Sequence, residues 1–369
     1  MRSESETIEH MPWWAWAAPT AAMVLLSLNL SGLARSDTPW VLLLAALLLG
    51  ASVFAAVHHA EVVALKVGEP LGSILLALAV TVIEVALILS IMLSGTAGSE
   101  TVARDTVYSA VMIVLNGVVG LCLVVGGARH HEQTFQVNGA TATLGVLGVL
   151  ATIALILPNF TRSADGPLYS QSQLLVVGVS SLVLYVVFLF VQTVRHRDYF
   201  MSDTVLPGEV EQPHAVPSTR ITQFSGLMLL ISLTAVVLLA KQLSYPLKKA
   251  VLGAGLPPSF VGVVIAGVVL LPEAAAALSA ARANRLQISL NLALGSALAS
   301  IGLTVPAVAA ASMLLKQPIA LGVSQADMVL LTLTLFVGTL TLATGRTTVL
   351  QGAVHLVIFA VFLFLSAIP

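Results

Sequence analysis

Apolar stretches of about twenty residues, the length that a helix needs to cross a bilayer, alternate with short polar breaks along almost the whole chain. A membrane barrel would instead need alternating segments of about ten residues, which these uninterrupted runs do not provide. The pattern therefore predicts an all-α polytopic membrane protein with eleven transmembrane helices. The expected spans are residues 13–33, 39–57, 72–93, 106–127, 139–158, 170–194, 222–241, 257–281, 287–309, 325–343 and 347–367.

One polar break is much longer than the others and divides the predicted helices into two sets of five. This linker, residues 195–221, separates a first five-helix repeat at 39–194 from a second at 222–369. Residues 1–38 hold an N-terminal tail and an extra first helix. Five crossings end on the side opposite to their start, so two such sets in series are inverted relative to each other. Inverted repeats are typical of secondary transporters, which bind their substrate near the middle of the membrane.

The composition supports a membrane protein and excludes other classes. Of the 369 residues, 58% are apolar and 9% are charged, whereas an average soluble domain carries about 25% charged residues. The net charge of −1 gives no indication of a nucleic-acid partner. The single cysteine, Cys122, excludes an intrachain disulfide framework. The expected partners are the lipid bilayer and transported ions, and the sequence leaves the oligomeric state open.

The distribution of basic residues predicts the orientation. If the N-terminus is cytoplasmic, the inside loops carry nine lysines and arginines and the outside loops carry seven. Cytoplasmic loops are enriched in these residues. We therefore expect a cytoplasmic N-terminus, a cytoplasmic linker and, because the helix count is odd, a C-terminus on the outside.

Two glutamates lie inside predicted spans. Glu84 is near the middle of 72–93 and Glu273 lies within 257–281, in the second helix of the first and of the second repeat. A charge at the centre of a membrane helix costs about 2.5–3.5 kcal/mol on insertion scales. Inverted symmetry would bring the two carboxylates together, and they cannot both stay ionised without a cation or a proton. No lysine or arginine lies at mid-depth in any predicted span, so the pattern favours an antiporter.

Neutral oxygen ligands at similar depth extend this predicted site. Thr81 lies three residues before Glu84, Asn116 is at the centre of 106–127, and Ser296 and Ser300 flank the middle of 287–309. Each hydroxyl could equally bond back to its own helix. Oxygen ligands suit Ca²⁺, or Na⁺ with fewer of them. These side chains and the two glutamates form the predicted cation- and proton-binding site, with no cofactor beyond the transported ions.

A second polar group precedes the span at 72–93. His58, His59 and Glu61 lie on a stretch with an amphipathic pattern, 57–67. One interpretation is a solvated interfacial helix. The other is an entry gate, in which Glu61 attracts a cation and the histidines titrate near neutral pH.

The residues around the first glutamate resemble a known signature. Gly68-Glu69-Pro70-Leu71-Gly72 is followed by Thr81-Val82-Ile83-Glu84, with Glu61 seven residues upstream of Gly68. This pattern is similar to the first signature of calcium/proton antiporters in the calcium–cation antiporter superfamily. The resemblance implies that Glu84 binds the transported cation and protons in turn.

The second half resembles the matching signature. Glu273 is followed 22 residues later by Gly295-Ser296, and the surrounding residues are similar to the bacterial ChaA-like branch. The asparagine that the family carries three residues before each glutamate is Thr81 in the first half and Leu270 in the second. The resemblance implies alternating access with Glu273 as the second exchanging carboxylate, in a bacterial inner membrane.

The residues and the resemblance together predict a cation/proton antiporter, with Ca²⁺/H⁺ exchange as the first expectation. Exchange of Na⁺ or K⁺ for protons on the same scaffold is the alternative, since this branch is associated with those ions as well. A channel would share the acidic pair but would place it around a pore. An intramembrane enzyme is a more distant alternative, because no aspartate pair or H-E-x-x-H motif lies within the predicted spans.

Overall fold

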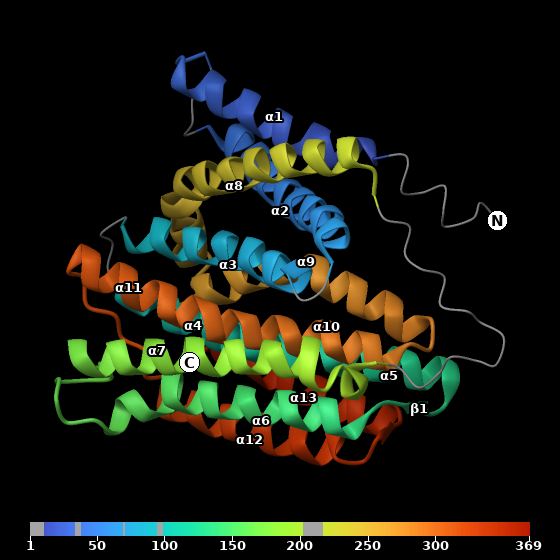
Figure 1. The fold of residues 1–369 in the computed structure, drawn as a ribbon. Coiled ribbons are helices and arrows are strands. Elements are labelled where there is room, and N and C mark those ends of the chain that lie inside the picture. Colours follow the sequence, from blue (N-terminus) through green and yellow to red (C-terminus); the bar gives the residue numbers. More distant parts are fainter. Residues whose placement is uncertain (1–10, 34–37, 69–70, 94–98, 202–216) are drawn as a thin grey trace. The chain divides into compact units, whose positions relative to one another are not determined.

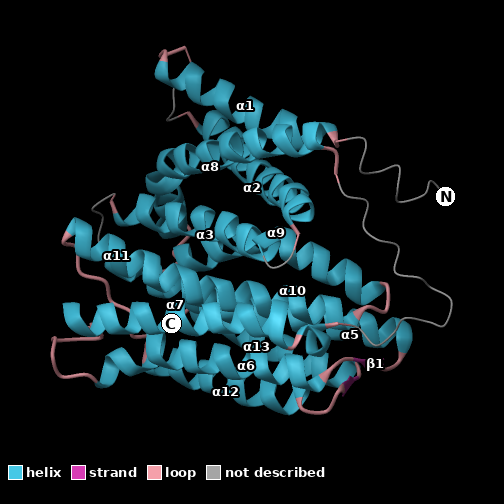
Figure 2. Ribbon diagram, viewed as in Figure 1, coloured by secondary structure: helices cyan, strands magenta, loops and turns pink. Residues whose placement is uncertain are grey.

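The computed structural model describes residues 11–33, 38–68, 71–93, 99–201 and 217–369, and these residues are almost entirely helical (Figure 2). Among them, ten helical stretches are long and apolar enough to cross a membrane by length and composition. The helix α1 precedes these ten. The prediction of an all-α fold with about eleven membrane helices is thus confirmed.

Several membrane-length rods consist of two helices joined without a break (Figure 1). In chain order the helices are α1 (Trp13–Leu30), α2 (Pro39–Val67), α3 (Leu71–Met92), α4 (Val102–Met112), α5 (Val119–His130), α6 (Val137–Ala151), α7 (Gln171–Phe190), α8 (Thr219–Gly253), α9 (Phe260–Arg282), α10 (Leu286–Ala299), α11 (Val305–Leu315), α12 (Gln325–Leu342) and α13 (Val349–Ala367). Two short strands, β1 (Gln133–Thr134) and β2 (Arg346–Thr347), pair antiparallel.

The chain folds into two compact units that each combine segments from both predicted repeats. Unit 1 comprises Met1–Ser94 and Val205–Ala250, and unit 2 comprises Gly95–Thr204 and Val251–Pro369. Unit 1 therefore holds α1, α2, α3 and nearly all of α8. Unit 2 holds α4–α7 and α9–α13.

In unit 1, α2 packs against both α1 and α3. The two glycines of the first signature have separate backbone roles in the connection from α2 to α3. Gly68 ends α2 with φ of 76°, a conformation that side chains disfavour. A Cβ on Gly72 would lie 2.7 Å from the carbonyl oxygen of Ala64, so only glycine permits this close approach. Glu69 and Pro70, the acidic and proline positions of the signature, lie outside the described residues.

Unit 2 is organised around two continuous rods, in each of which a π-helical segment separates two α-helices. The rod α4–α5 is joined by a π-helical segment at Ile113–Val118, and the rod α10–α11 by another at Ser300–Thr304. These are the third helices of the two predicted repeats. The helix α9 packs against α4, α5 and α10, while α13 packs along α5 and α7 along α11.

Candidate functional site

Glu84 is the deeply buried carboxylate of unit 1. It lies within α3, and only 2% of its surface is exposed. Thr81, one turn earlier on the same helix, is also buried, and its hydroxyl donates to the carbonyl of Ala77 at 2.8 Å. That bond uses the hydroxyl proton and leaves oxygen lone pairs. A back-bonded Thr81 therefore still has the chemistry of a cation ligand.

Glu273 lies in the middle of α9 in unit 2 and is half-buried. The preceding residue, Pro272, has no N–H, so the carbonyl of Val268 loses its α-helical donor. Since α9 packs against α10, the helix of Glu273 adjoins the rod that carries the two predicted serine ligands. Of these, Ser300 is buried at the start of the π segment Ser300–Thr304, and Ser296 is half-buried one turn before it.

Asn116 is completely buried in the first π segment, Ile113–Val118. Its carboxamide is directed to α12 and α13: Nδ2 donates to Thr334 Oγ1 at 2.9 Å, and Oδ1 lies 3.1 Å from His355 Nδ1. Nδ2 also lies 3.8 Å from Met112 Sδ, so within unit 2 this predicted ligand has three side-chain partners. The sequence favours a packing role for His355 over a proton carrier and leaves it out of the predicted site, because a lone histidine on an apolar helix gives no signal of its partners.

The predicted gate residues have different environments on α2. His59 is fully buried, and its Nε2 lies 3.0 Å from the carbonyl oxygen of Ala15 on α1. Pro19 explains why that carbonyl is available, because a proline four residues later removes its helical donor. The ring of His58 packs against Trp14, with centroids 5.4 Å apart. These two histidines therefore contact the extra helix, whereas the side chain of Glu61 is exposed.

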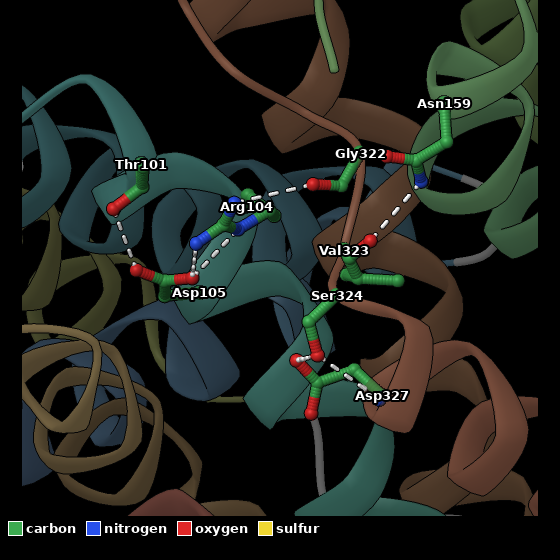
Figure 3. Close-up of polar contacts among 8 residues, drawn as sticks. All are labelled: Thr101, Arg104, Asp105, Asn159, Gly322, Val323, Ser324 and Asp327. Carbon is green, nitrogen blue, oxygen red and sulfur yellow. Dashed lines mark hydrogen bonds and ion pairs between the residues drawn. The ribbon is translucent and has the colours of Figure 1, made fainter. Parts of the chain in front are cut away.

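An ion pair at the start of α4, between the half-buried Arg104 and the buried Asp105, also escaped the sequence prediction (Figure 3). Asp105 is only 8% exposed, and Arg104 contacts its Oδ1 at 2.8 Å. Thr101 donates to the other carboxylate oxygen at 2.8 Å, and Arg104 also donates to the carbonyl of Gly322 at 3.2 Å. The predicted span began at residue 106 and so treated both charges as loop residues. Their adjacency at the edge of an apolar run was the available signal.

The segment before α12 is bonded to neighbouring elements of unit 2 (Figure 3). Ser324 caps α12 and donates to Asp327 Oδ2 at 2.7 Å. Asn159 donates to the carbonyl of Val323 at 3.1 Å. With the bond from Arg104, these contacts connect α4, the end of the α6 rod and the start of α12. We interpret the role of this cluster as structural, because its bonds connect three elements of unit 2 to one another.

A buried glutamate on α3 and a half-buried glutamate on α9, both within apolar helices of membrane length, are typical of a multi-pass membrane protein that handles ions. The sequence profile of the sodium/calcium exchanger protein family matches residues 38–194 and 224–368, which is most of the chain. The chain belongs to this family. Its relatives are transporters that carry ions without a resident cofactor, so the chain is a transporter rather than an enzyme.

Individual relatives match over nearly the full length. A putative ionic transporter, y4hA, from Sinorhizobium fredii is 56% identical over 361 residues, covering 98% of this chain and 97% of the relative. The sodium-potassium/proton antiporter ChaA of Escherichia coli is 35% identical over 346 residues, covering 94% and 93%. Among solved structures, native YfkE has a TM-score of 0.73 at 17% identity, covering 96% of this chain and 100% of the other. The H⁺/Ca²⁺ exchanger CAX has a TM-score of 0.68 at 16% identity, covering 94% and 87%.

Proposed function

We propose that the chain is a secondary active cation/proton antiporter in which Glu84 and Glu273 bind the cation and protons in turn. The observation that carries this proposal is the placement of one glutamate within the second helix of each predicted repeat, 39–194 and 222–369. Inverted repeats would bring the two helices to a shared site at mid-membrane. Residues 1–38 then form an extra element, and residues 195–221 a linker between the repeats.

Electroneutrality favours Ca²⁺ as the exchanged cation. Two neighbouring carboxylates are neutralised equally by one Ca²⁺ or by two protons, so the loaded site crosses the membrane uncharged in both directions. An uncompensated charge at that depth would cost several kcal/mol. The hydroxyls of Thr81, Ser296 and Ser300 would add the neutral oxygens that Ca²⁺ coordinates.

Exchange of Na⁺ or K⁺ for protons is the second candidate. It is favoured by the 35% identity to the sodium-potassium/proton antiporter of Escherichia coli. Two departures from the family signature also favour it, since Thr81 and Leu270 stand where amide ligands are expected. One monovalent ion would need one ionised and one protonated glutamate to keep the site neutral.

We further propose a bacterial inner-membrane location with a cytoplasmic N-terminus. The support is the excess of basic residues in the loops that would then face inward. In this orientation the exposed Glu61 of α2 lies toward the cytoplasmic side, where it would attract cations to the entrance. A reporter that is active only in the cytoplasm should stay silent when fused after Pro369.

A proteoliposome experiment tests the proposed function. An imposed pH gradient should drive uptake of Ca²⁺, Na⁺ or K⁺ against its concentration gradient, with each ion tested separately. Glu84→Gln and Glu273→Gln should each reduce exchange to background, because glutamine keeps the shape but can neither ionise nor release a proton. Near-normal coupled exchange by either variant would refute the shared-carboxylate mechanism.

Glu100→Gln is the matched control. Glu100 is exposed at the N-terminal end of the α4–α5 rod, so its neutralisation should leave exchange unchanged. Loss of exchange in this variant as well would show that the assay reports general damage rather than the loss of Glu84 or Glu273. Gradient-driven uptake separates a transporter from a channel, in which an ion only runs down its own gradient.

A further inference from the structure

A histidine that the proposed mechanism does not use lies in a completely buried polar network in unit 2. His355 on α13 is 1% exposed, and its Nδ1 lies 3.1 Å from Asn116 Oδ1. Its Nε2 lies 3.1 Å from Thr341 Oγ1 on α12. The amide of Asn116 continues the network to Thr334 on α12 at 2.9 Å. Four buried side chains therefore bind three separate stretches of chain to one another.

The network is satisfied by an uncharged histidine. Asn116 Oδ1 can only accept, so the facing Nδ1 donates a hydrogen to it. The other ring nitrogen, Nε2, then accepts from the hydroxyl of Thr341. A neutral imidazole offers one donor and one acceptor, and both have a partner here. Removing the ring would leave the oxygen of Asn116 buried without this donor.

The residue that His355 holds belongs to an unusual piece of backbone. Asn116 lies in the π segment Ile113–Val118, where the hydrogen bonds span five residues, as in the bond from Val119 N–H to the Val114 carbonyl. Single π turns inside α-helices are uncommon and occur frequently at functional sites. Because such a turn shifts the helix register by one residue, its position determines where the following residues point.

The backbone of helix α13 lies close to the backbone of the α4–α5 rod around this segment. A Cβ added to Gly120 would lie 3.0 Å from His355 Cβ, and one on Gly352 would lie 2.6 Å from Val124 N. A Cβ on Gly117 would lie 3.1 Å from the ring of Phe359. The histidine is thus part of a tight contact that covers the π segment from one side. The π segment also packs against α9, which carries Glu273, and against α10, which carries Ser296.

The π segment of the α10–α11 rod is covered in an analogous way, but by side chains of different chemistry. Ser300–Thr304 packs against α7, and a Cβ on Gly302 would lie 2.8 Å from Tyr185 Cβ. In each predicted repeat, the third helix carries a π segment that is covered by the fifth helix of the other repeat. An aromatic ring makes the contact at Gly302, whereas a hydrogen-bonded histidine makes it at Asn116.

We propose that His355 is a positioning residue for cation exchange, which fixes the π segment at Asn116 and through it the packing of α9 around Glu273. In this role Asn116 is a structural bridge, and neither residue carries the transported proton. The inference rests on the proposed function only in taking Glu273 as an exchanging carboxylate.

The test compares three variants of the full chain in proteoliposomes. His355→Leu removes both hydrogen bonds, and leaving a buried polar group unsatisfied costs enough to raise the apparent cation KM by about tenfold. His355→Asn places an amide where Nδ1 was and should restore most of the affinity. Thr143→Val is the matched control, since this buried hydroxyl donates only to its own helix at Gly139. The pH profile of exchange should be the same in all of them.

A double variant tests whether His355 acts through Asn116. If it does, adding His355→Leu to Asn116→Leu should raise the KM no further, because coupled residues are not additive. The melting temperature should fall by less than it falls when His355→Leu is made in the wild type, since only the bond to Thr341 remains to be lost. Additive effects would overturn the proposal. So would a wild-type KM in His355→Leu, or a pH profile displaced in His355→Asn, which would make the histidine a proton carrier. Failure of the proposed function would appear separately, as normal exchange by Glu273→Gln with the His355–Asn116 coupling in melting temperature intact.

Discussion

The crossing of α4 and α9 offers the sharpest test of how the helix that carries Glu273 is held in place. Gly262 of α9 lies directly against the backbone of α4. An added Cβ would lie 2.5 Å from the carbonyl carbon of Asp105, 2.7 Å from its Cβ and 2.7 Å from Thr106 N. Ordinary contacts between such atoms are about 3.5–4.0 Å. Gly262→Ala therefore requires the two helices to separate by about 1 Å, because backbone atoms cannot rotate aside.

Overpacking of this kind costs about 1–3 kcal/mol. Alanine also favours the helical state over glycine by about 1 kcal/mol, which partly hides the cost. Gly267→Ala on the same helix isolates the steric effect, since a Cβ there would meet nothing within 4 Å. Both variants gain the same propensity, so the difference between them measures the crossing.

The assay is thermal unfolding of the purified chain in detergent, followed by exchange in proteoliposomes. A steric cost of 1–3 kcal/mol should make Gly262→Ala melt on the order of 2–6 °C below Gly267→Ala. The Arg104–Asp105 ion pair beside the crossing should be displaced with α4, and exchange should fall because α9 moves. Equal melting temperatures and equal exchange in the two variants would refute the tight crossing.

Two further predictions follow from the same structure. Apparent cation affinity should fall as the pH drops on the side where the site is open, because cation and protons compete for Glu84 and Glu273. Equilibrium binding measured across a pH series should approach a two-proton slope for Ca²⁺ and a one-proton slope for Na⁺. An affinity that does not change with pH would contradict a shared site. Pro19→Ala should restore a helical N–H donor to the Ala15 carbonyl. His59→Leu should therefore lower the melting temperature of this variant less than it lowers that of the wild type. Additive changes in melting temperature would contradict the proposed hydrogen bond.

The sequence was sufficient for those features that depend on local pattern. Each apolar run long enough to cross a bilayer became a helix, because burial in lipid requires every backbone group to bond within its own segment. Glu84 was detectable for the same reason, since a carboxylate in such a run is costly. Gly68 and Gly72 were recognised by resemblance, and the structure supplies their physical reasons in a positive φ and a close carbonyl.

Features that depend on contacts between distant residues were not predictable. Asn116 and His355 are 239 positions apart, and each reads by itself as a polar residue in an apolar helix. The partner of Asn116 is decided by which face of α13 meets the π segment, and no local periodicity encodes that. Asp105 was missed for a different reason. A partly buried ion pair at the first turn of a helix looks in the sequence like the end of a loop.

Prolines within or at the ends of the helices connect several of these observations. A helical proline removes the donor for a carbonyl of the preceding turn, and a buried carbonyl needs another partner. For Ala15, freed by Pro19, the partner is the ring of His59 at 3.0 Å.

At the end of the α6 rod, the π turn would have the N–H of residue 158 donate to the carbonyl of Ile153, but Pro158 has no N–H. Tyr169 Oη donates to this carbonyl instead, at 2.5 Å. Tyr169 lies outside the membrane spans, and burial raises its pKa to about 12, so it keeps the proton that this bond needs. In both places a side chain from another segment supplies the missing donor, so the carbonyl that the proline leaves without a donor forms a tertiary hydrogen bond.

Pro272 has the same effect on a carbonyl near Glu273. It deprives the Val268 carbonyl of its α-helical donor at one turn's distance from a carboxylate. A carbonyl oxygen can be satisfied by a cation as well as by an N–H or O–H group, and Ca²⁺ sites commonly combine carboxylate and backbone oxygens. A proline that creates a structural acceptor in α1 would thus create a ligand in α9. The difference lies in the neighbour: a histidine ring faces the freed oxygen of Ala15, whereas a carboxylate that can itself bind a cation accompanies that of Val268.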